Sequence, residues 1–155
     1  MDSARTIALL IHPILALTLI FWMIKQYGWK KQSRELKGEE RLAVRKKHER
    51  IGEIVVWSAI AVASMGFVGR MLAGWITNRD VTSELMPQSL HGWTGPLGVI
   101  LLWTMARWGR SARDLREAGD KFDVPKSKHG RAADLIVALM AIHAFLGFLY
   151  VFSVL

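Results

Sequence analysis

Residues 135–155, at the end of the chain, read LIVALMAIHAFLGFLYVFSVL and contain no Asp, Glu, Lys or Arg. A helix needs about 20 predominantly apolar residues to cross the hydrocarbon core of a bilayer. Two further uncharged runs, 7–24 and 85–106, have similar lengths. A fourth run, 54–69, is followed by Arg70 and then by more apolar residues. The sequence therefore predicts four membrane-spanning helices.

These runs predict an all-α fold, a transmembrane four-helix bundle in a single membrane domain that takes up residues 1–155. The expected spans are approximately 7–27, 51–75, 87–108 and 132–154. Hydrophobic residues make up 52% of the chain, and the remainder is too short for a separate soluble domain of ordinary size. We expect the helical connections to break at Gly38 and Pro125.

The net charge of +8 is concentrated in two connections. Ten of the 21 Lys and Arg residues lie between Lys25 and Arg50, and eight more lie between Arg107 and Arg131. By the positive-inside rule these connections are cytoplasmic and both termini lie outside, as in a multi-pass integral membrane protein. Because topology accounts for the charge, we expect no nucleic-acid partner. The chain has no Cys, which excludes disulfides and thiolate metal sites, and it has no motif for hydrolysis or group transfer.

The chain also repeats itself at a spacing of about 80 residues. The matching positions are Lys47-His48-x-Arg50 with Lys128-His129-x-Arg131, Gly66-Phe67 with Gly147-Phe148, and His12 with His91. The sequence therefore predicts two repeated helical hairpins, each with one His near the outer start of its first helix and one at the inner start of its second. In membrane bundles built from repeats, binding sites lie between the halves.

All five His residues lie in or at the ends of the predicted spans, where ionisable residues are candidates for function. His12 and His91 fall at an outer depth, and His48 and His129 fall at an inner depth. Without Cys and with few intramembrane carboxylates, two imidazoles at each depth suit a planar macrocycle that needs two axial donors. The metal ligands that we predict, for two haems b, are therefore His12, His91, His48 and His129. In the alternative, all four are packing residues and their matched depths are accidental.

Other residues surround these predicted ligands. Gly66, Gly95 and Gly147 lie on the same helical faces, where glycine lets a haem or a neighbouring helix approach the backbone. Four cations stand within a turn of the inner His pair, either beside haem propionates or as inside-positive anchors: Lys47, Arg50, Lys128 and Arg131. His143 lies about 21 Å beyond His129 along a helix, near the outer depth. A bond to a propionate, proton transfer to a quinone, alternative ligation and simple packing all stay open for it.

Several stretches resemble the four-helix core of the cytochrome b561 family. They are His12-Pro13-Ile14-Leu15, Lys47-His48, Ser89-Leu90-His91-Gly92-Trp93-x-Gly95 and Lys128-His129. The resemblance covers nearly the whole chain and implies a dihaem protein with its outer haem on His12 and His91 and its inner haem on His48 and His129. That family usually has six spans, and the two flanking helices are absent here. The chain is also similar to an uncharacterised family of four-span bacterial membrane proteins, which implies a bacterial inner membrane.

The function predicted from these features is transmembrane electron transfer through two bis-His haems b. As electron donor and acceptor we expect a quinol, an ascorbate-like reductant or a redox protein, so a role as a transmembrane oxidoreductase is open. The alternative is an accessory haem- or pigment-binding subunit of a larger photosynthetic or respiratory membrane complex. The missing flanking helices favour it, because a homodimer or a larger complex would cover the exposed faces of the bundle.

Overall fold

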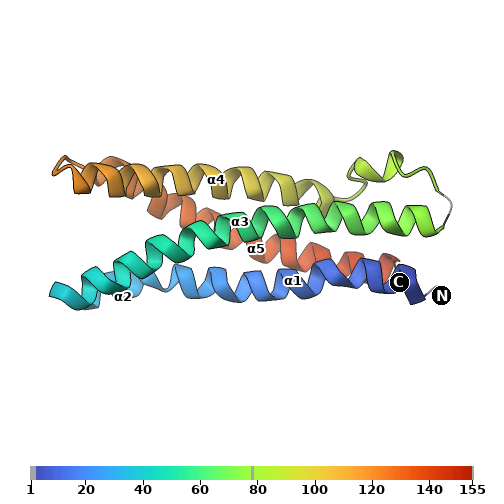
Figure 1. Ribbon diagram of the computed structural model, residues 1–155, viewed down its shortest axis with the longest axis horizontal. Helices are drawn as coiled ribbons and strands as arrows, with labels where there is room; N and C mark the ends of the chain where they lie inside the picture. The colour runs from blue at the N-terminus through green and yellow to red at the C-terminus, as the bar shows by residue number, and fades with distance from the viewer. Residues whose placement is uncertain (1–2, 78, 155) are drawn as a thin grey trace.

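A computed structural model describes residues 3–77 and 79–154, with side chains up to residue 152. The described residues form helices and short connections and contain no strand, which confirms the all-α prediction. The elements are α1 (Ser3–Tyr27), α2 (Trp29–Glu35), α3 (Gly38–Ile76), the 3₁₀ helix η1 (Ser83–Leu85), α4 (Leu90–Glu117) and α5 (Asp123–Val154), as Figure 1 shows.

The long helices lie in two pairs. α1 packs along α3, and α4 packs along α5, while α3 also touches α4 and α1 touches α5. The turn between α2 and α3 and the turn between α4 and α5 lie at one end of the molecule (Figure 1). Both chain termini and the segment 79–89 lie at the opposite end. The two connections that carry most of the basic residues therefore share one end.

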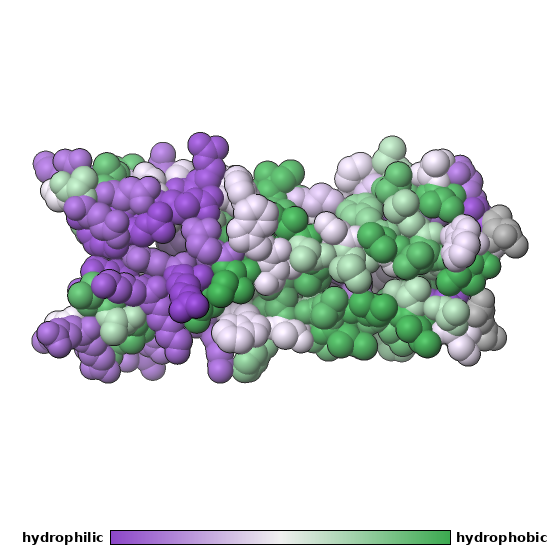
Figure 2. All heavy atoms as spheres, viewed as in Figure 1, coloured by the Kyte–Doolittle hydropathy of each residue, from purple (hydrophilic) through white to green (hydrophobic). Residues whose placement is uncertain are grey.

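Among the described residues, three helical segments are long and apolar enough to cross a membrane: Ser3–Glu35, Gly38–Ile76 and Asp123–Phe152. α4 is not among them, because Gly, Thr, Pro and Trp occupy its first turns and the uncharged residues 85–89 precede its start. Many large apolar side chains are exposed, among them Ile7, Leu17 and Phe145. Figure 2 shows hydrophobic residues over the half nearer the termini and hydrophilic residues at the end with the basic connections.

One of the two expected helix breaks is where the sequence places it. Gly38 has φ +55° and begins α3 after two extended residues, which confirms that prediction. The prediction for Pro125 is wrong, since Pro125 lies in the first turn of α5. A helix tolerates Pro there because the first backbone N–H groups have no partner within the helix. The break itself occurs at Gly119, which has φ +78° and follows the end of α4.

The buried core is a layer halfway along the bundle, which we call the apolar layer. It consists of Val55, Val56, Ala59, Leu102 and Ile136, with Leu19 and Met23 of α1 packed against it. Val55 follows His48 by seven residues and Ile136 follows His129 by seven, so both lie about two turns further along their helices. No polar side chain is buried among the described residues. Because the apolar layer lies beyond His48 and His129 along α3 and α5, on the side toward the outer His residues, it separates the outer His residues from the inner ones.

The closest approach of α1 and α3 supplies a test of this packing. A Cβ on Gly69 would lie 2.9 Å from the carbonyl oxygen of Ala8, so Gly69→Ala should force the two helices apart. We expect the free energy of unfolding to fall by about 1–3 kcal/mol, measured by SDS titration in mild detergent. Gly130→Ala is the matched control, because its Cβ would meet nothing within 4 Å and Ala favours a helix. Equal losses in both variants would contradict the close α1–α3 approach.

Candidate metal centres

The outer centre is built from the first turns of α4 and the first half of α1. The Ser89 hydroxyl caps α4 by accepting a hydrogen bond from the Gly92 N–H at 3.1 Å, which places His91 in the first turn. His12 lies on α1 just before Pro13. The ring centres of His12 and His91 are 5.9 Å apart, with 66° between the ring planes. His12, from the α1–α3 pair, therefore lies opposite His91, from the α4–α5 pair.

Both outer imidazoles are held by backbone carbonyls of the helix beside them. The Nδ1 of His12 lies 2.9 Å from the Val62 oxygen, and the Nδ1 of His91 lies 3.1 Å from the His143 oxygen. Because a carbonyl only accepts, each Nδ1 carries the proton and donates it. The Nε2 of each ring therefore keeps its lone pair. Metal-binding His residues usually have such a hydrogen bond from the ring nitrogen that does not bind the metal, because it fixes the orientation of the ring.

Glycines make room for these rings. A Cβ on Gly66 would lie 3.1 Å from the Nδ1 of His12, and a Cβ on Gly147 would lie 2.7 Å from the Cε1 of His91. The third predicted glycine, Gly95, faces His143, but its Cβ would lie 3.4 Å from Cε1, which is an ordinary van der Waals contact. The structure therefore places all three predicted glycines against outer His rings.

His143 belongs to the outer centre. Its ring stacks on that of His91, with ring centres 4.1 Å apart and planes 21° apart. The Thr94 hydroxyl donates to the His91 carbonyl at 3.1 Å and lies 2.8 Å from the Nδ1 of His143, from which its oxygen can accept. The donor atoms of His12, His91 and His143 all lie within 4.8 Å of one another. Sequence reasoning placed His143 at this depth but missed Thr94.

The inner centre joins α3 to α5. The rings of His48 and His129 have centres 6.2 Å apart and planes at 88°. The Nδ1 of His129 lies 3.0 Å from the Met105 carbonyl and donates to it, which again leaves Nε2 with its lone pair. Trp29 stacks on His48 at 5.5 Å. The Nδ1 of His48 is buried and has no hydrogen-bond partner among the described residues.

A cavity of about 360 Å³ lies at the inner centre and is lined by both His48 and His129. Figure 2 shows the molecule hollowed among the hydrophilic residues of this end. The basic residues that line the cavity are Arg41, Arg45, Arg110, Arg113, Arg116 and Lys126, against two acidic ones, Glu49 and Glu53. This excess of basic groups makes the cavity suited to an anionic group.

Two ion pairs fasten α3 to α4 in the cavity wall. Arg110 lies 2.9 Å from Glu53, and Arg116 lies 3.0 Å from Glu49. Arg113 instead bonds to Asp114 on its own helix at 3.0 Å, and this hydrogen bond raises the pKa of the guanidinium. The Nε of Arg45 is buried without a hydrogen-bond partner among the described residues.

Sequence analysis predicts four cations beside the inner His pair. In the structure, these four side chains lie on the surface of the protein. Lys47, Arg50, Lys128 and Arg131 are all exposed, and none of them lines the cavity. Arg45, which does line it, stands three residues before His48, and that spacing places two residues on one helical face. The spacing within α3 could therefore have identified Arg45 as a residue of the cavity. The arginines of α4 could not be identified in this way, because the sequence does not show how far α4 continues beyond its uncharged run.

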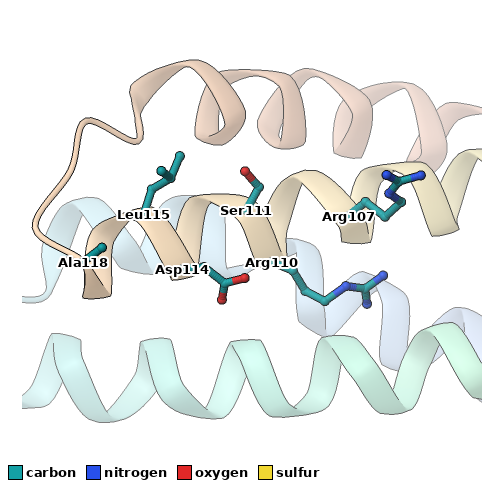
Figure 3. Close-up of a pocket in the computed structure, with 6 residues that line it drawn as sticks. All are labelled: Arg107, Arg110, Ser111, Asp114, Leu115 and Ala118. Carbon is teal, nitrogen blue, oxygen red and sulfur yellow. The ribbon is translucent and has the colours of Figure 1, made fainter.

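A second hollow, of about 530 Å³, is an open groove on the surface of α4 (Figure 3). Its lining residues are Arg107, Arg110, Ser111, Asp114, Leu115 and Ala118. These residues come from α4 and its C-terminal cap, Ala118, and none is a His, although Arg110 also lines the cavity of the inner centre. We assign no chemistry to it.

No known protein family matches the chain, and comparison with curated proteins and with solved structures also found no match. The function of the chain must therefore follow from its own side chains. The strongest feature is that the two pairs of helices bring imidazoles together at two separate levels.

The Glu49–Arg116 pair gives a stability test of the inner wall. Both side chains are about four-fifths buried, at 22% and 20% exposure, so Glu49→Gln leaves a largely buried guanidinium with only the more exposed carboxylate of Glu117, at 3.4 Å. We expect this variant to lose about 1–2 kcal/mol of unfolding free energy. Glu35→Gln, which breaks an ion pair between exposed side chains, is the control and should change stability by less than about 0.5 kcal/mol. Similar losses from both would place Glu49 outside the wall of the cavity.

Proposed function

We propose that the chain is a multi-pass membrane protein that carries electrons across a bacterial inner membrane by means of two b-type haems. His12 and His91 would ligate the outer haem, and His48 and His129 the inner one. The described helices support membrane insertion, since three segments are apolar and long enough to cross. In the proposed orientation the basic connections are cytoplasmic and both termini lie outside.

The spacing of the two imidazole pairs carries the proposal. A metal–nitrogen bond of about 2 Å, with each ring nitrogen about 1 Å from its ring centre, places two imidazoles on opposite sides of one metal with centres roughly 6 Å apart. The observed spacings are 5.9 Å for the outer pair and 6.2 Å for the inner pair. Both pairs therefore fit two axial ligands of one iron.

The surroundings of the His residues fit a haem as well. Three of the four predicted ligands have Nδ1 bonded to a backbone carbonyl, so Nε2 is the atom offered to a metal. At the inner centre the 360 Å³ cavity adjoins both rings, and its basic lining would pair with anionic propionates. At the outer centre Gly66 and Gly147 let the rings lie against the helix backbone.

When bound, haem b would supply a one-electron iron couple at each level. The chain's own residues would hold the ligand rings, exclude water through the apolar layer and set the charge around each centre. Because six Arg and Lys residues line the inner cavity and the outer centre holds a third imidazole, the two centres should differ in potential.

Haem content tests the proposal directly. Protein purified from haem-replete cells should show about two haems per chain and a reduced-minus-oxidised spectrum typical of low-spin b-type haem. His129→Ala should lose about one haem and keep the other, because the outer centre, which His143 marks on α5, is about 21 Å further along that helix. Colourless protein would refute the proposal, and a chlorophyll-type spectrum would favour the accessory pigment-binding alternative.

A second test separates two candidate partners of the inner propionates. Arg45→Gln should lower the midpoint potential of the inner haem by removing a cation from the cavity wall, as measured by redox titration. Arg50→Gln changes an exposed side chain of the same helix and should leave the potential nearly unchanged. The opposite result would favour Arg50, which sequence analysis predicts, over Arg45.

A further inference from the structure

The outer centre contains one imidazole more than a haem needs. Of the chain's five His residues, three lie at the outer centre and two at the inner one. The third outer ring, His143, is held as firmly as the predicted ligands, because Thr94 bonds to its Nδ1. Its Nε2 then keeps a lone pair, and one ring nitrogen of His143 lies within 4.8 Å of one from His12 and one from His91.

The three rings are not equivalent. His91 and His143 both come from the α4–α5 pair of helices and stack nearly parallel, with ring centres 4.1 Å apart. Two imidazoles on opposite sides of one metal need ring centres roughly 6 Å apart, so these two cannot act as its opposed ligands without moving. His12 comes from α1 and meets His91 from the other side of the bundle. His143 can therefore stand in for His91 but not for His12.

We propose that His143 is a reserve axial ligand of the outer haem, one that takes the place of His91 when His91 is lost or displaced. This inference rests on the proposed function, since it assumes a haem at the outer centre. The exchange requires the His143 ring to shift by a distance comparable to the 4.1 Å stacking distance and to release its bond to Thr94. Loss of the His91 ring would also free the space beside Gly147, against which that ring now packs.

The test compares haem content and spectra across a set of variants. His91→Ala should keep about two haems per chain with altered outer-haem spectra, whereas the double variant with His143→Ala should keep about one. His12→Ala should also fall to about one, because no second ring lies on its side. His129→Ala is the inner control and should fall to about one, since the inner centre has no third His.

The haem retained at the unaltered centre reports that each variant is folded. If His91→Ala loses both haems, His91→Gln takes its place, with the same expectations. Electron paramagnetic resonance should show a second low-spin bis-His signal in His91→Ala that disappears in the double variant. The inference is overturned if His91→Ala or His91→Gln binds as little haem as the double variant while the unaltered protein binds two. An unaltered protein without haem would instead overturn the proposed function.

Discussion

The arrangement of the outer centre depends on one hydrogen bond that occurs twice. In each helix pair, the Nδ1 of a His on the first helix donates to a carbonyl of the second, from His12 to Val62 and from His91 to His143. The two accepting residues are 81 positions apart, which is the spacing of the sequence repeat. Because the ring then lies against the accepting helix one turn further on, position i+4 must be glycine. Those positions are Gly66 and Gly147.

This bond occupies the Nδ1 of each His and leaves its Nε2 with a lone pair. The pairs meet through imidazoles at two levels, and the apolar layer fills the space between the levels. The layer follows the same repeat, since Val55 and Ile136 are also 81 residues apart. The surroundings of the two His pairs differ. Six basic residues line the cavity at the inner pair, whereas the outer pair has a third His beside it.

Sequence periodicity predicted the helices, the pairing of the His residues by depth and the glycines that face them, because a repeat copies local geometry. It did not predict the break at Gly119, since Pro125 is the stronger breaker in a helix interior but is tolerated in a first turn. Nor did it identify the role of Thr94. That role depends on which neighbouring helix the side chain meets, and residue spacing within one helix does not contain that information.

Mean hydropathy underestimates the capacity of α4 to span a membrane, because one side of this helix lines a site and is less apolar. Its first half is less apolar than the other long helices, yet its exposed apolar residues recur every three or four positions and so form a single stripe. These residues are Leu90, Trp93, Leu97, Ile100 and Trp103. The opposite side carries His91, Thr94 and Gly95, which build the outer centre. In the proposed bundle only the stripe needs to meet lipid, so α4 can be the fourth span although polar and small residues lower its average hydropathy.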